Sequence, residues 1–471
     1  MVSGSMPTNH ALVRWLFLGT VVLLARSIHS AFLWVEEAYP YAGTVQFLLV
    51  RRTPYIDFFY DKPPFGLFFA ALWHASPGFP GRLAGALYVV ACCLLIHHMA
   101  KSWIRNEGSP ALSSQSWWPT LLLAVGLTFY IPAAVIPLAP DLLMILPHLA
   151  AIHFARQQRA GWAGLCAGLA IWTNSKGILV ALACGLWSPA AAILGLGIGA
   201  LQLLIPGNWE QVWQWGWIYS SDTFLEHPFT EGLRRTLNWS GFHAAALVGT
   251  ACYFLNEKRD RLRPALWLVL SLAGVAGGWR FFPRYYFQLL PVVALLGGMG
   301  LARMAQSRRW INAVALSLLL IPIARFGPRY ITLALQGEGD WADTALNRDS
   351  RAVSARILAE AKPSDTILVW GYRPDILVYT HLPLGAPYLD SQPLTGVLAD
   401  RHLTDSRPTV AELAAANRKR LLQDKPDWLV DGLGPINARL AVVNYPDLTA
   451  WMENYREVFR TPSSVVYRRK S

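Results

Sequence analysis

Long apolar runs separated by short polar segments dominate the first two-thirds of the chain. A helix needs about 20 mostly apolar residues to cross a lipid bilayer, and fewer where it is short or kinked. By this measure the sequence predicts eleven membrane spans, so we expect a polytopic α-helical membrane protein. The spans are expected at 12–34, 82–101, 118–136, 141–155, 161–173, 177–188, 190–205, 241–255, 264–279, 286–302 and 310–326.

The polar segment between the first two spans, residues 35–81, is the longest such connection near the N-terminus. It contains an apolar run, Phe65–Trp73, that is too short to cross a bilayer. We expect this run to form an interfacial helix within a first outer loop.

The pattern changes near residue 328, where polar residues begin to appear throughout. Short apolar runs typical of buried strands alternate with helical stretches, which predicts a small α/β domain over residues 329–471 after a membrane domain over residues 1–328. No glycine-rich phosphate loop, zinc-ligand spacing or nucleophile elbow occurs in it, so it receives no catalytic assignment. Strands are expected at Thr366–Trp370, Trp428–Val430, Glu457–Phe459 and Ser464–Tyr467, and helices at Arg351–Ala361 and Val410–Gln423.

Composition supports the membrane class, because 54% of the residues are hydrophobic and only 15% are charged, against about 25% charged in soluble domains. The net charge of +12 comes from cations in short loops, which is the pattern of cytoplasmic loops in membrane proteins. We therefore expect no nucleic-acid partner. The five cysteines lie in apolar runs without a CxxC motif, which indicates buried thiols and not a disulfide or zinc framework.

The cation bias also predicts the orientation, because cytoplasmic loops carry the excess of lysine and arginine. The N-terminus is then cytoplasmic, and residues 35–81, residues 206–240 and the C-terminal domain lie outside. Several cations on the outer side break the bias, as an anion-binding site there would. The cytoplasmic cations are Lys101, Arg105, Arg156, Arg159, those in 258–263 and those in 303–309.

Residues 206–240 carry Trp209, Trp213 and Trp217 at helical spacing. They are consistent with an interfacial helix in the aromatic belt of the membrane. A surface that faces a carbohydrate or another acceptor remains the alternative.

Candidate acids flank the expected spans. Glu36 and Glu37 are adjacent, so on a helix their side chains diverge by about 100° and only one needs to face a site. Alternatively, both stabilise the start of the next helix through its dipole. Asp141 stands where the fourth span begins, either as a helix N-cap or as another acid of the site.

Candidate cations lie on the same predicted side. Lys62 follows Asp61 and precedes a rigid Pro-Pro pair, which suits a lysine that holds a phosphate as a point charge; a surface cation near lipid headgroups is the alternative. Lys176, Arg280 and Arg284 occupy expected outer turns. Together these cations would suit an anionic group attached to a lipid.

These residues occur in an ordered set of motifs over roughly residues 10–305 that resembles a known family. The chain resembles the polyprenyl-phosphate-sugar-dependent glycosyltransferases of the C-type membrane fold, which include protein O-mannosyltransferases and aminoarabinose transferases of lipid A. The motifs are Glu36-Glu37-Ala38-Tyr39, Pro54-Tyr55-Ile56-Asp57-Phe58-Phe59, Asp61-Lys62-Pro63-Pro64, Arg82-Leu83, Pro140-Asp141, Ser175-Lys176-Gly177 and Pro283-Arg284-Tyr285-Tyr286 followed by Pro291.

The resemblance implies the roles of individual residues. Glu36 matches the catalytic carboxylate, where the family usually has aspartate, and Glu37 and Asp141 match the family's other acids. Lys62 and Arg284 match the contacts to the donor phosphate. The expected catalytic residues are Glu36, Glu37 and Asp141, and the expected substrate-binding residues are Asp57, Asp61, Lys62, Lys176, Arg280, Arg284 and Tyr285.

The expected function is therefore transfer of a sugar from a polyprenyl-phosphate donor to a lipid, glycan or protein acceptor on the outer face of the cytoplasmic membrane, with inversion implied by the resemblance. No cofactor is assigned, although the acids could also bind a divalent metal. A lipid-linked-sugar flippase is an alternative, but its charges should lie near the middle of the spans. A non-catalytic envelope-assembly subunit is a further alternative, against which the acid-rich first loop argues.

Overall fold

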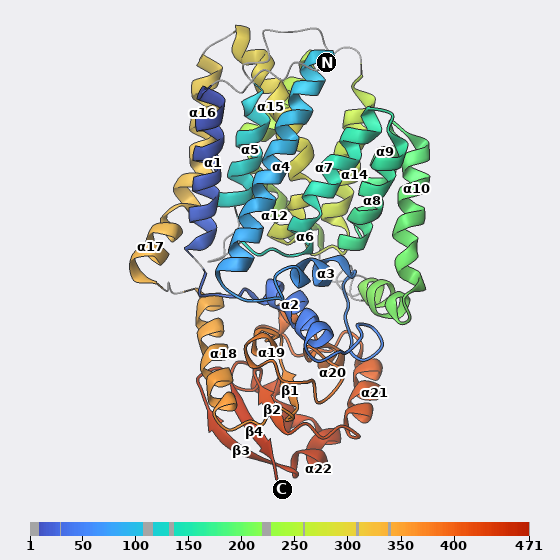
Figure 1. The fold of residues 1–471 in the computed structure, drawn as a ribbon, viewed down its shortest axis with the longest axis vertical. Helices are drawn as coiled ribbons and strands as arrows, with labels where there is room; N and C mark the ends of the chain where they lie inside the picture. Colours follow the sequence, from blue (N-terminus) through green and yellow to red (C-terminus); the bar gives the residue numbers. More distant parts are fainter. Residues whose placement is uncertain are drawn as a thin grey trace.

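The structure, a computed structural model, describes residues 9–28, 30–106, 116–130, 136–218, 228–257, 260–307, 310–337 and 341–470. It has two parts stacked along the long axis of the molecule, a helical bundle and a smaller C-terminal domain (Figure 1). Residues 33–75, here called the junction segment, lie between the two parts. Parts of the predicted span 118–136, of residues 206–240 and of the cation clusters predicted to be cytoplasmic lie outside the described residues.

The bundle contains a helix for each apolar run that the sequence identified. The expected span 141–155 is divided into α6 and α7, and α12 precedes the run that forms α13. The bundle helices are α1 (Asn9–Ser27), α4 (Phe79–Asn106), α5 (Trp117–Phe129), α6 (Pro140–Leu143), α7 (Ile145–Arg156), α8 (Ala160–Thr173), α9 (Gly177–Gly185), α10 (Pro189–Ala200), α12 (Pro228–Phe242), α13 (Ala244–Asn256), α14 (Leu262–Ala276), α15 (Leu290–Ser307), α16 (Trp310–Phe326) and α17 (Pro328–Gln336), with a short 3₁₀ segment η4 (Pro283–Gln288).

The structure does not confirm the count of eleven spans. In the described chain, two helical stretches are long and apolar enough to cross a membrane, Phe79–Arg105 and Trp310–Gln336. A third would be the pair Pro189–Leu204 and Trp209–Ile218, which is bent by 112°. Most other apolar helices have 10–17 residues, because turns such as Asn174–Lys176 and prolines such as Pro140 divide the apolar sequence into shorter helices.

Small residues let the bundle helices approach closely. A Cβ atom on Gly300 of α15 would collide with the carbonyl oxygen of Gly249 in α13. Contacts of this kind replace side-chain interdigitation where helix backbones touch, as is common in membrane bundles.

The first predicted span and the first predicted loop need correction. The first helix, α1, ends at Ser27 and not at Trp34. Trp34 has an extended backbone conformation, and the helix α2 (Val35–Leu48) begins at the next residue. Much of the segment expected to be an acidic loop is therefore helical. Glu36 and Glu37 occupy the first turn of α2, where the helix dipole favours negative charge. The apolar run predicted as an interfacial helix forms α3 (Phe65–Ala71).

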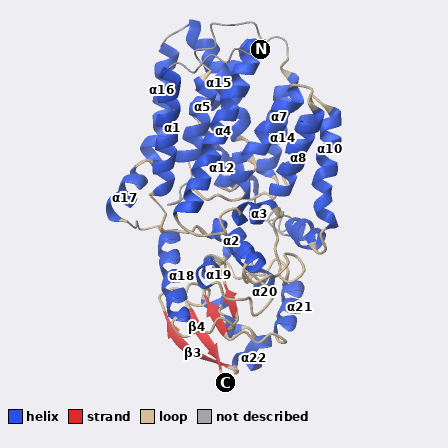
Figure 2. Cartoon of the chain, in the orientation of Figure 1, coloured by secondary structure: helices blue, strands red, loops and turns tan. Residues whose placement is uncertain are grey.

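The C-terminal domain has the predicted strands, and Figure 2 shows all strands of the described chain within this domain. They form one mixed sheet of order β1-β2-β4-β3, in which β1 and β2 are parallel and the other neighbours antiparallel. The elements are α18 (Ala342–Leu358), β1 (Ile367–Trp370), α19 (Asp375–Thr380), α20 (Gln392–Thr395), α21 (Ala411–Leu421), β2 (Trp428–Asp431), α22 (Thr449–Met452), β3 (Tyr455–Arg460) and β4 (Val465–Arg469).

The junction segment shares a hydrophobic core with the C-terminal domain. Tyr39, Tyr60 and Leu67 belong to the same buried cluster as Ile357 and Trp428. Backbone contacts add to this packing, since the amide of Phe59 donates to the carbonyl of Pro387 over 2.8 Å. One hydrophobic core therefore joins residues from both sides of position 328, near which the composition of the sequence changes.

Candidate active site

Glu36 and Glu37 point in different directions from the first turn of α2. Glu36 forms an ion pair with Arg284, and its side chain is 18% exposed. Glu37 is buried and accepts hydrogen bonds from the guanidinium of Arg82, over 2.9 Å, and from the amide of Leu138. The divergence follows from the helical geometry. Glu36 therefore faces the candidate site, while Glu37 holds α2 against Arg82 of α4 and against the segment around Leu138.

Arg284 connects two of the candidate catalytic acids. It lies at the start of η4, and its Nε is 3.3 Å from Asp141 Oδ2 while its Nη1 contacts Glu36. Asp141 also accepts a hydrogen bond from Asn174 Nδ2 over 2.9 Å. The N-cap alternative for Asp141 is wrong, because Ala139 is the N-cap of α6. The Asp141 carboxylate is instead committed to Arg284 and Asn174.

Lys176 provides a buried positive charge beside these acids. It is the N-cap residue of α9, and its ammonium group is buried without a hydrogen-bond partner. Its Nζ lies 3.0 Å from the centre of the Tyr285 ring, so the ring face contacts the cation. Burial lowers the pKa of Lys176 to about 8, although the charge of Asp141 acts in the opposite direction. A buried ammonium group with free donors is suited to an anionic ligand.

Lys62 also faces this region. It forms an ion pair with Asp61, and its side chain is 40% exposed, which leaves donors available. The charges of Lys176 and Lys62 both act on the carboxylate of Asp141. The structure thus brings Glu36, Asp141, Lys62, Lys176, Arg284 and Tyr285 together, with Asp61 beside Lys62.

Two predicted substrate-binding residues have other contacts. Asp57 is exposed and accepts a hydrogen bond from the amide of Thr53 over 2.6 Å, so it stabilises a local turn. Arg280 lies 3.5 Å from Asp400 of the C-terminal domain, although its charge also acts on Lys176. Arg280 therefore connects the rim of the cluster to the C-terminal domain.

Sequence reasoning missed the contribution of the C-terminal domain. Asp390 is buried, and burial followed by the charge of Asp61 raises its pKa from 3.8 to about 7. Burial, followed by the charges of Asp390 and Asp61, also raises the pKa of Tyr372. No local motif marks either residue. Asn174 was missed as well, although its place directly before Ser175-Lys176 is a signal that could have identified it.

The described residues include no group of three or more His, Cys, Asp or Glu side chains that could hold a metal ion. Asp61 and Asp390 could contribute carboxylate oxygens to a divalent cation, and Asp61 Oδ1 is buried without a hydrogen-bond partner.

The raised pKa of Asp390 predicts a pH dependence of stability. The folded protein keeps this proton up to about pH 7, whereas the unfolded chain loses it near pH 4, so the free energy of unfolding falls as the pH rises between these values. The full effect is about 4 kcal/mol. Asp390→Asn should flatten this fall when melting temperatures are compared at pH 5 and pH 8. The exposed-site variant Glu453→Gln should keep the wild-type slope, and equal slopes in all three proteins would contradict the assignment.

Comparison with known proteins supports the fold. No protein-family model matches the sequence, and a search of curated proteins finds no match. Among solved structures, the chain is similar to ArnT from Cupriavidus metallidurans in its crystal structure with bound undecaprenyl phosphate. The two structures align with a TM-score of 0.54 over 98% of each chain at 14% sequence identity. The resemblance indicated by the motifs is therefore confirmed at the level of the fold.

Proposed function

We propose that this protein is a membrane glycosyltransferase that moves a sugar from a polyprenyl-phosphate donor to an acceptor hydroxyl, with inversion. The observation that carries the proposal is the position of Arg284 between Glu36 and Asp141, beside the buried ammonium group of Lys176, which has no hydrogen-bond partner. A carboxylate next to several cations suits a reaction that deprotonates one substrate and releases a phosphate from the other. The shared fold with ArnT, which binds undecaprenyl phosphate in its crystal structure, supports a polyprenyl phosphate as the lipid.

In the proposed reaction, the acceptor oxygen forms a bond to the anomeric carbon as the bond from that carbon to the phosphate oxygen breaks. Glu36 accepts the acceptor proton as general base. Lys62, Lys176 and Arg284 stabilise the charge on the departing polyprenyl phosphate. Asp141, itself held by Asn174, keeps Arg284 in place, and the remaining donors of the guanidinium group can turn to the phosphate.

We further propose that the reaction takes place at the outer face of the cytoplasmic membrane, with residues 1–328 as the membrane part and residues 329–471 outside. The site lies next to the junction segment, and α4 extends from there to the far end of the bundle, where Arg105 lies (Figure 1). Arg105, Arg156 and Arg159 are among the cations that the sequence predicts on the cytoplasmic side. The site would then lie on the opposite, outer side.

The proposal is tested with the full-length protein in liposomes that contain polyprenyl-phosphate sugars extracted from the source cells. Membranes of the same cells supply the acceptor. Release of free polyprenyl phosphate, together with labelled sugar on the acceptor, is the expected result. Translocation of the intact donor without release would instead identify a flippase, and neither process would contradict both functions.

Replacement of Lys62 by alanine should weaken donor binding. A hydrogen bond to a charged group contributes about 1.5–3 kcal/mol, so the KM for the donor should rise roughly 10- to 100-fold. The exposed cation Arg51 in the same segment provides the matched control, and Arg51→Ala should leave the KM near the wild-type value. Melting temperatures should accompany the kinetics because Asp61 loses its partner. An unchanged KM in a folded Lys62→Ala protein would remove the phosphate role.

A further inference from the structure

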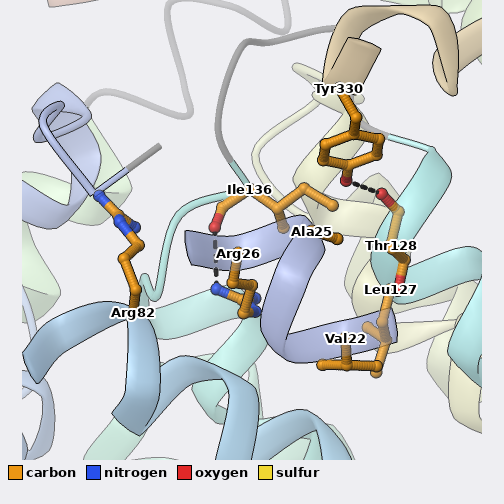
Figure 3. A pocket seen from close by; sticks show the side chains of 8 residues that line it. All are labelled: Val22, Ala25, Arg26, Arg82, Leu127, Thr128, Ile136 and Tyr330. Atoms are coloured by element: carbon orange, nitrogen blue, oxygen red, sulfur yellow. Dashed lines mark hydrogen bonds between the residues drawn. The ribbon is translucent and has the colours of Figure 1, made fainter. Parts of the chain in front are cut away.

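A small cavity is lined by Arg82, the residue that pairs with Glu37, and by none of the residues of the candidate active site. It is enclosed by α1, α4, α5 and α17, and Figure 3 shows the side chains around it. Its walls combine apolar groups, among them Val22 and Leu127, with two arginines, Arg26 and Arg82. Its volume is about 10 Å³, roughly the room that one water molecule needs.

Both arginines in this cavity have a nitrogen atom without a partner. Arg26 is 7% exposed, and its Nη1 donates to the carbonyl of Ile136 over 3.2 Å, whereas its Nη2 is buried and unpartnered. Arg82 is 3% exposed and donates from Nη1 to Glu37 and from Nη2 to the carbonyl of Phe32, whereas its Nε is buried and unpartnered.

The charges around the two side chains do not balance. Glu37 forms an ion pair with Arg82, and its charge also acts on Arg26, so the two guanidinium groups share this one negative charge. A buried charge without a counter-ion is costly, and so is a buried donor without an acceptor. A bound anion would relieve both costs.

The neighbouring helix leaves space for the Arg26 guanidinium. Gly85 of α4 faces it, and a Cβ atom at this position would lie 2.6 Å from Arg26 Nη1. The arginine is therefore accommodated by the shape of the bundle, and is not simply turned inward from an exposed position.

We propose that this cavity is a site for one small anionic group, held between Arg26 Nη2 and Arg82 Nε. The group is a chloride ion from solution or a single oxygen of a phosphate from a lipid headgroup, because the cavity holds no more than one atom and only an anion can accept from both nitrogens while balancing the second positive charge. It would also stabilise the segment before Asp141, since Arg26 binds Ile136 and Glu37 binds Leu138. The site is separate from the proposed transfer reaction and does not depend on it.

The test measures the melting temperature of the purified full-length protein in two arms. In the first, chloride replaces gluconate at constant ionic strength in a neutral detergent. In the second, nanodiscs of phosphatidylglycerol are compared with nanodiscs of the phosphate-free lipid digalactosyldiacylglycerol, both in gluconate. We expect a rise of a few degrees in one arm, which identifies dissolved anion or lipid phosphate as the source, and its loss in Arg26→Met.

The matched control is Arg325→Met, which removes an exposed arginine from the end of α16 and should keep the response. If Arg26→Met does not fold, Ala25→Val offers a second test, because it fills the cavity without removing a charge. No response in either arm, or a response that persists in the folded pocket variants, would overturn the proposal.

Discussion

Replacement of Glu36 by glutamine is expected to lower sugar transfer by about 10²- to 10⁴-fold, the usual contribution of a general base. The amide has the size of the carboxylate but cannot accept the proton of the acceptor hydroxyl at neutral pH. Glu36 is partly exposed and its partner Arg284 keeps the contact with Asp141, so the protein should remain folded.

The measurement is release of polyprenyl phosphate from the extracted donor, with the melting temperature recorded for each protein. Glu412→Gln makes the same chemical change at an exposed position of α21 and should retain wild-type turnover. Normal turnover in Glu36→Gln would remove the base assignment. A proportionate loss of folded protein would show that Glu36 acts only through its ion pair.

Replacement of Arg82 by methionine is expected to produce the largest loss of stability, about 3–5 kcal/mol, because it removes the cation that pairs directly with the buried carboxylate of Glu37. Arg82 and Glu37 are 3% and 1% exposed in this pair. The change also removes the bond to the carbonyl of Phe32 that ties α4 to the segment before α2.

Thermal unfolding of the purified protein measures this effect, and a double substitution isolates the charge. Arg82→Met with Glu37→Gln should recover much of the lost stability, since the amide oxygen can still accept from Leu138. The exposed pair Arg356–Glu360 is the control, because Arg356→Met should cost about 0–1 kcal/mol. Equal losses at both arginines, or no recovery in the double variant, would contradict the importance of the buried charge.

The strands of the C-terminal domain could be predicted from the sequence because each is a short apolar run between polar segments, as at Trp428–Val430. The ends of the bundle helices could not. Apolar sequence continues from α1 to Trp34, yet the helix ends at Ser27 and a new one starts at Val35. Hydropathy reports burial in lipid or protein equally, and so it does not mark where the chain turns.

The same contrast holds for the candidate site. Glu36, Asp141, Lys176 and Arg284 could be proposed because charged side chains next to apolar runs are costly unless they are used. The pairing of Arg284 with both acids required the structure, because the three residues come from separate parts of the chain. Asp390 carried no signal, since an aspartate in a polar domain is ordinary until its burial beside Asp61 is known.

The shared core of the junction segment and the C-terminal domain has a consequence for biogenesis. The Gln46 side chain donates to the carbonyl of Leu382, 336 residues further along the chain, and accepts from the amide of Leu384. During translation, the junction segment, which contains Lys62, therefore cannot form these contacts until most of the polypeptide has been made. A nascent chain whose C-terminal domain has not yet been synthesised lacks these contacts, so the junction segment is expected to reach its final packing only after that domain has been made.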